Sequence, residues 1–166
     1  FLTMARLGDV SAVGSLSTSQ AGNAGFELFM PAADTGFGVS LTGVDDVNGD
    51  GMCDAAVGQL EGSDGAVTIV FLGAGLVPLS AITISTSHPA VLGTAEGTGF
   101  GHSLAQIGDV SRPPDGIPDL LVGQTNASTL ADGTGPLQGA LVVLHLSADT
   151  SVGAKYTQGM GATSDI

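Results

Sequence analysis

Hydrophobic residues occur in short runs along the chain, and clusters of Gly, Pro, Asp and Ser separate them. Aliphatic and β-branched residues, which favour strands, dominate the runs at residues 67–72, 81–85 and 141–146. No segment of helical length repeats its apolar residues with a period of about 3.6. The pattern predicts an all-β protein made of short strands joined by turns.

The same order of motifs occurs twice. Residues 35–41 read T-G-F-G-V-S-L, and residues 98–104 read T-G-F-G-H-S-L. Each of these Phe-Gly segments is followed by an Asp-rich loop and then by a similar apolar segment, A-A-V-G-Q at 55–59 and L-L-V-G-Q at 120–124. A repeat of this length with about four strands per unit fits one propeller blade or a similar stacked unit.

Each unit closes with Gly-Ala and an apolar run, at residues 65–72 and 139–146. A degenerate third copy opens the chain, because residues 4–11 align with 104–111 and residues 24–30 match the closing run. This copy lacks the Asp-rich loop and one strand. The predicted units are a degenerate repeat at 1–34 and two full repeats at 35–97 and 98–166.

The most distinctive motif is D-x-N-x-D-G-x-x-D at residues 46–54, which spaces side-chain oxygens around a glycine. Ca²⁺ prefers about six to eight hard oxygen ligands, and such a loop can wrap one ion. An EF-hand would need Glu where this chain has Val57, so the motif is a different calcium loop. A polar turn without an ion is the alternative explanation. The candidate ligands are the side chains of Asp46, Asn48, Asp50 and Asp54 and the backbone carbonyl of Met52.

The second unit carries a variant of this loop, with two extra residues before its Asp-Gly. Its candidate ligands are Asp109, Ser111, Asp115 and Asp119, with the backbone carbonyl of Ile117 as the counterpart of Met52. In the degenerate copy no such loop follows Asp9, and we expect no calcium there.

These motifs resemble FG-GAP repeats, the blades of integrin α-subunit β-propellers. The resemblance rests on Phe-Gly-x-Ser, the Asp-rich loop, the Val-Gly after it and the closing Gly-Ala strand. It implies four-stranded antiparallel blades, calcium held by the loop side chains, and a role at the cell surface or outside the cell. The chain departs from the family at 58–60 and 123–125, where Gly-Ala-Pro is expected. It also has fewer than three units, whereas a propeller of this family needs about seven blades.

The chain is strongly acidic, with 16 acidic and three basic residues and a net charge of −13. Nucleic-acid binding is not expected because it requires clustered Lys and Arg, and binding to anionic membranes is disfavoured for the same reason. No apolar stretch approaches the roughly 20 residues of a membrane span. The charge fits an extracellular calcium protein, since two bound ions would cancel part of it.

Other chemistry is sparse. Gly38 to Leu41 and Gly101 to Leu104 resemble the start of a nucleophile elbow but lack its final glycine, and the three histidines lack zinc-site spacing. We therefore predict that the chain is not an enzyme. Cys53 is expected to be a small packed residue rather than a ligand, because calcium prefers oxygen to sulfur. Asn126 opens a glycosylation sequon, which matters only in a secreted eukaryotic protein.

A single blade cannot bury both of its faces, so the chain is expected to need neighbours. The predicted function is an extracellular, calcium-stabilised structural or adhesion repeat that self-associates through its open faces into a fibre or ring. The alternatives are a fragment of a larger propeller that binds a protein or glycan ligand, and an accessory propeller of a secreted enzyme.

Overall fold

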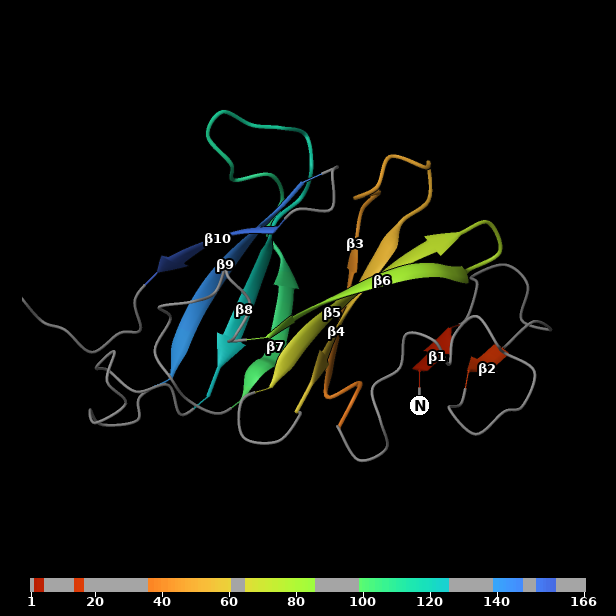
Figure 1. Cartoon of the computed structure of the whole chain (residues 1–166), viewed down its shortest axis with the longest axis horizontal. Helices are drawn as coiled ribbons and strands as arrows, with labels where there is room; N and C mark the ends of the chain where they lie inside the picture. The colour runs from red at the N-terminus through yellow and green to blue at the C-terminus, as the bar shows by residue number, and fades with distance from the viewer. Residues whose placement is uncertain are drawn as a thin grey trace, which may run out of the picture.

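The computed structural model describes residues 2–4, 14–16, 36–60, 65–85, 99–125, 139–147 and 152–157. Within this part of the chain every regular element is a β-strand (Figure 1). The predicted all-β class is therefore confirmed for the described residues.

Two four-stranded antiparallel sheets carry most of the described chain, and each follows the order of the sequence. The first sheet consists of β3 (Ser40–Val44), β4 (Asp54–Gln59), β5 (Ala66–Gly73) and β6 (Val77–Ser85). The second sheet consists of β7 (Phe100–Gln106), β8 (Leu120–Gln124), β9 (Ala140–Leu146) and β10 (Val152–Thr157). A separate antiparallel pair joins β1 (Leu2–Met4) to β2 (Gly14–Leu16). The closing apolar runs predicted at 65–72 and 139–146 correspond to β5 and β9.

The two sheets also share their register. Ser40 lies opposite Gly58 in the first sheet, and Ser103 lies opposite Gly123 in the second. The same correspondence continues between the second and third strands of each sheet, as the pairs Ala56–Ile69 and Leu121–Val143 illustrate. The repeated sequence therefore folds into repeated pairing.

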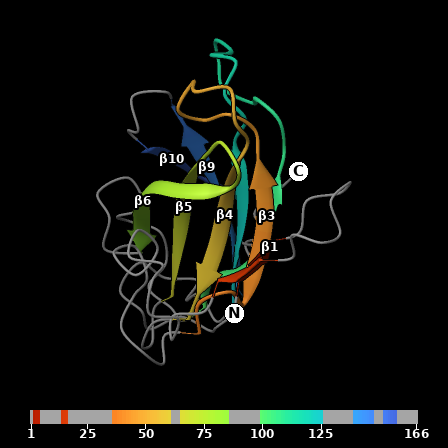
Figure 2. The ribbon, with the colours of Figure 1, turned by 90° about the vertical axis from the view of Figure 1, so that its right-hand side faces the viewer.

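The sheets lie side by side and pack face to face (Figures 1 and 2). We call the two faces of each sheet front and back, and equivalent positions of the two sheets carry the same name. The front face of the first sheet contacts the back face of the second, so both sheets have their front faces turned the same way. The front residues in this core include Ala56, Val67, Ile69 and Phe71, and the back residues include Leu120, Val122, Leu144 and Leu146.

The back face of the first sheet is buried as well. Ala55, Val57, Val70 and Leu72 form a second apolar cluster, against which Phe37 packs. β4 and β5 are consequently buried on both faces, as continuous apolar strands require. In the second sheet, by contrast, burial alternates along β8 and β9, and the front face is the more exposed one.

The sheets approach each other most closely where β3 and β4 meet the start of β7. A Cβ atom added to Gly58 would lie 2.0 Å from the carbonyl oxygen of Gly101. Gly65 forms an isolated parallel bridge with Phe100 beside this point. The glycines of the repeat thus allow backbone from two sheets to come together where side chains would collide.

Some predictions fall outside the described residues. Most of the degenerate repeat at 1–34 does so, including Asp9, and so does the sequon at Asn126. Cys53 is described, and its predicted packing is wrong, since the residue is exposed. The buried position at this end of the loop belongs to the next residue, Asp54, whose side chain turns into the protein.

Candidate metal-binding loops

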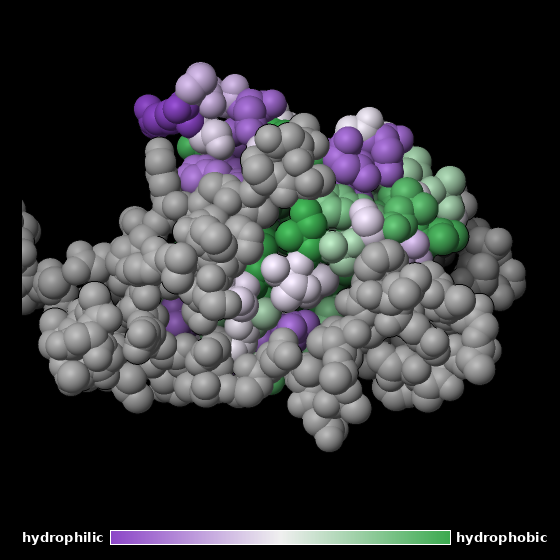
Figure 3. Space-filling view, in the orientation of Figure 1, coloured by the Kyte–Doolittle hydropathy of each residue, from purple (hydrophilic) through white to green (hydrophobic). Residues whose placement is uncertain are grey.

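The two Asp-rich loops join the first and second strands of each sheet and lie at the same end of the molecule (Figures 1 and 2). Figure 3 shows them as hydrophilic tips above the more hydrophobic sheets. The shared fold of the sheets therefore brings both candidate sites to one side.

The first loop winds around the carboxylate of Asp46. One oxygen of Asp46 accepts hydrogen bonds from the N–H groups of Gly49, at 2.7 Å, and Asp50, at 2.9 Å. The other accepts the N–H of Gly51 at 2.7 Å. Gly51 has φ +86°, a conformation that strongly favours glycine, so the motif glycine makes the tight turn possible.

Asn48 and Asp50 continue the same turn. The amide oxygen of Asn48 accepts the N–H of Asp50 at 3.1 Å, and a carboxylate oxygen of Asp50 accepts the N–H of Met52 at 2.8 Å. The side-chain amide of Asn48 also donates to Asp50 at 3.1 Å. These two candidate ligands are therefore in direct contact.

Asp54 ties the end of the loop to the sheet. Its side chain is buried, and its two oxygens accept the N–H groups of Val47, at 3.0 Å, and Leu72, at 2.9 Å. Burial raises the pKa of the Asp54 carboxyl, and the negative charges of Asp50 and Asp46 raise it further, while the two N–H donors lower it. The loop therefore gathers negative charge around a partly desolvated carboxylate.

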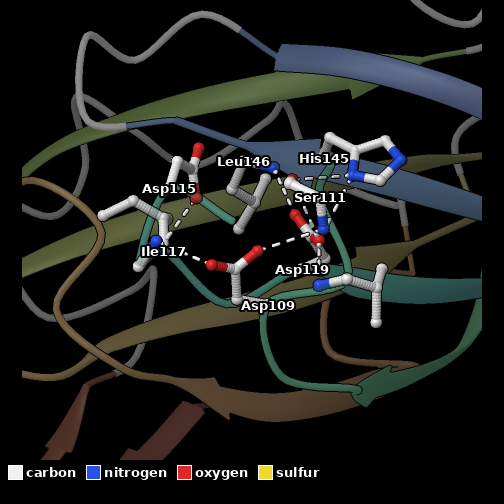
Figure 4. Close-up of polar contacts among 9 residues, drawn as sticks. Asp109, Ser111, Asp115, Ile117, Asp119, His145 and Leu146 are labelled. Carbon is white, nitrogen blue, oxygen red and sulfur yellow. Dashed lines mark hydrogen bonds and ion pairs between the residues drawn. The ribbon is translucent and has the colours of Figure 1, made fainter. Parts of the chain in front are cut away.

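The second loop reproduces this scaffold despite its insertion (Figure 4). Each of its three candidate aspartate ligands accepts at least one backbone N–H from the same position as its counterpart in the first loop. The N–H of Gly116 donates to Asp109 at 2.6 Å, that of Ile117 to Asp115 at 2.9 Å, and those of Val110 and Leu146 to Asp119 at 2.8 and 3.1 Å. Asp119 is buried, like Asp54.

The second loop differs by a histidine, to which spacing along the sequence assigns no role. Nδ1 of His145 lies 3.2 Å from a carboxylate oxygen of Asp119 and 3.1 Å from the hydroxyl of Ser111 (Figure 4). Phe71 occupies the position of His145 in the first sheet. The alignment of β5 with β9 was the available signal, since it places this imidazole one residue before Leu146, whose N–H binds Asp119.

Asp45 lies outside the ligand spacing and has a different role. Its carboxylate accepts a hydrogen bond of 2.9 Å from the side-chain amide of Gln106, on the second sheet. This contact connects the first loop to the neighbouring repeat.

The donor chemistry of both loops fits Ca²⁺, which selects carboxylate, amide, hydroxyl and carbonyl oxygens. As the side chains stand, no group of three or more His, Cys, Asp or Glu among the described residues is arranged to hold a metal ion. The carboxylates instead accept backbone N–H groups. The use of the Met52 and Ile117 carbonyls as ligands stays a prediction.

No protein-family model matches the chain, and no curated protein matches it. The described residues contain no helix of the length and apolarity needed to cross a membrane.

Proposed function

We propose that this protein is a non-enzymatic, calcium-stabilised β-repeat of FG-GAP type that acts in structural assembly or adhesion outside the cell. The single observation that carries the proposal is the common scaffold of the two loops. Although their lengths differ, both hold their three candidate aspartate ligands by hydrogen bonds from equivalent backbone N–H groups. Two polar turns that bind nothing would not have to share these hydrogen bonds.

Calcium would supply charge neutralisation in such a loop. Asp46, Asn48, Asp50 and Asp54 would hold the ion in the first loop, with the carbonyl of Met52. The hydrogen bonds of the loop already organise its backbone. Burial raises the pKa of Asp54, and the negative charges of Asp50 and Asp46 raise it further, so the ionised loop carries an electrostatic cost. A bound cation offsets that cost and favours the folded loop. In the second loop Asp109, Ser111, Asp115, Asp119 and the carbonyl of Ile117 would have the same role.

A structural role is favoured over an enzymatic one by the use of the repeated serine. The hydroxyl of Ser40 donates a hydrogen bond of 2.6 Å to the backbone carbonyl of Gly101, so it joins two sheets. Stacked sheets with a common register support the blade architecture, and such units extend by adding neighbours. Assembly with further copies is therefore the partner interaction that we propose.

The test is thermal unfolding in calcium and in chelator, with magnesium as the control ion. Extracellular calcium modules bind with dissociation constants of about 10⁻⁴ to 10⁻³ M, so 1 mM calcium should add about 0.4 to 1.4 kcal/mol per site. For a chain of this size we expect the midpoint to rise by roughly 2–4 °C per kcal/mol.

Variants assign the effect to each loop. Asp50→Ala and Asp115→Ala change exposed loop residues, and each should remove part of the calcium-induced shift. The matched control is Asp45→Ala, which lies in the first loop but outside the ligand set. Identical unfolding in calcium and chelator would contradict the metal part of the proposal.

A further inference from the structure

The joint between the two sheets has two complementary halves. The first sheet supplies a receiving half, in which Ser40 donates to the carbonyl of Gly101, and Gly58 and Gly65 leave room for the approaching backbone. The second sheet supplies an entering half, the Phe-Gly at the start of β7. Phe100 is fully buried in this joint.

The second sheet carries its own receiving half. Ser103, Gly123 and Gly139 occupy the positions of Ser40, Gly58 and Gly65 in the shared register. Among the described residues, the nearest atoms to a Cβ added at these glycines belong to a neighbouring strand of the same sheet. A Cβ on Gly123 would contact Ser103, and one on Gly139 would contact Gln124. The receiving half is thus present and has no second sheet against it among the described residues.

The apolar face beside this receiving half is uncovered. Leu141 is 49% exposed, although Val67, at the equivalent position of the first sheet, is 0% exposed. Leu121 and Val143 are half-buried, while their counterparts Ala56 and Ile69 belong to the buried core. The front face of the second sheet therefore resembles an interface without its partner.

The first sheet carries an entering half whose residues are more exposed than their counterparts in the second sheet. Gly38 is exposed and Phe37 is half-buried, whereas Gly101 and Phe100 are buried. Leu41 is 53% exposed, while its counterpart Leu104 packs against the core. Because the back of β4 and β5 is already buried, this half consists of β3 and the residues that lead into it.

We infer that β3 of a second copy docks on the front face of β7, β8 and β9, and repeats between chains the part of the internal joint that the first strand of a sheet and its preceding residues form. This inference rests on the assembly role proposed above and specifies its surface. The side chains of Ser103, Leu121, Leu141 and Val143 are uncharged, so two acidic chains can meet there. The contact is head to tail, because different surfaces of the two copies meet, and such contacts form rings or open filaments.

The first experiment measures mass by light scattering over a range of concentrations in calcium. We expect the mass of the unchanged chain to increase with concentration. Leu141→Glu should weaken self-association by about tenfold or more, because it places a charge in an apolar contact. Leu79→Glu is the matched control, since Leu79 is 56% exposed on β6, away from this face. Circular dichroism verifies that both variants fold.

A mixing experiment tests the direction of the contact. Leu41→Glu, at an exposed position of β3, impairs the entering half and leaves the receiving half intact, whereas Leu141→Glu does the reverse. Each variant alone should be monomeric, and their mixture should form a one-to-one dimer. An interface between two identical surfaces cannot give this complementation.

Two outcomes overturn the inference, and each bears differently on the proposed function. Assembly that Leu141→Glu leaves unchanged shows that copies meet elsewhere, and the assembly role survives. A monomer at every concentration excludes docking between copies, while a calcium-dependent rise in the unfolding midpoint still supports the calcium-stabilised repeat.

Discussion

The hydroxyl of Ser40 donates a 2.6 Å hydrogen bond to the backbone carbonyl of Gly101, and this contact joins two sheets across 61 residues of sequence. Gly58 lies opposite Ser40 and faces the same carbonyl. This part of the joint therefore depends on the Ser40 hydroxyl and on the absence of a side chain at Gly58.

Gly58→Ala should separate this joint. The added Cβ would lie 2.0 Å from the carbonyl oxygen of Gly101 and 2.2 Å from Oγ of Ser40, so backbone must move. We expect the free energy of unfolding to fall by about 3 kcal/mol in urea denaturation. Gly43→Ala is the control, because nothing lies within 4 Å of its added Cβ, and a strand alanine gains about 0.5 kcal/mol over glycine. Equal stability of the two variants would show that the sheets do not meet here.

Asp54→Ala should destabilise the fold even without metal. The substitution leaves the N–H groups of Val47 and Leu72 without their acceptor, and a buried unsatisfied donor costs about 1–3 kcal/mol. In chelator we expect a loss of about 2–5 kcal/mol in the free energy of unfolding. Asp50→Ala, at an exposed position, should lose less than about 1 kcal/mol. A similar loss in both variants would contradict the anchoring role of Asp54.

The raised pKa of Asp54 predicts a pH dependence of stability. A carboxyl whose folded pKa exceeds its unfolded value binds its proton more tightly in the folded state. Its ionisation therefore destabilises the fold above the folded pKa, and this penalty disappears as pH falls towards the unfolded value of about 3.8. Urea denaturation in chelator, from pH 7 down to pH 4, measures the effect as a difference between the unchanged chain and Asp54→Asn.

We expect the unchanged chain to gain stability relative to Asp54→Asn as pH falls through this window. Comparison with the asparagine variant removes the contribution of the other acidic residues. A constant difference over the whole range would contradict the prediction.

The sequence was sufficient to predict the repeated strands and the two Asp-rich loops between them, whereas the use of their oxygens as ligands stays a prediction. The strands could be predicted because the Phe-Gly segment, the loop and the closing apolar run recur in the same order. In the structure, the first three strands of the two sheets pair in the same register. The glycine of the loop motif identified the turn at Gly51. These features are local, so spacing along the chain defines them.

The contacts between distant residues could not be predicted in the same way. Spacing indicates that Asp54 can reach its own loop, but its bond to Leu72 depends on the pairing of β4 with β5. The imidazole of His145 meets Asp119 for the same reason. The packing of front face on back face depends on both sheets together, and no single motif encodes it.

Leu76 occupies an unfavourable backbone conformation in the turn between β5 and β6. Its φ is +64°, and its N–H donates to the carbonyl of Gly73 at 3.1 Å. A leucine in this left-handed region is strained by about 1 kcal/mol, whereas asparagine adopts it more readily. Leu76→Asn should therefore raise the free energy of unfolding by about 0.5–1 kcal/mol in urea denaturation.

The control for this substitution is Val77→Asn, at the neighbouring exposed position, where β6 begins. Asparagine is unfavourable in strands, so this variant should be slightly less stable than the unchanged chain. If Leu76→Asn raises the free energy of unfolding and Val77→Asn lowers it, the gain comes from the backbone conformation at Leu76. If both variants lost stability equally, the side chain of Leu76 would matter more than its backbone, and relief of strain would be the wrong explanation.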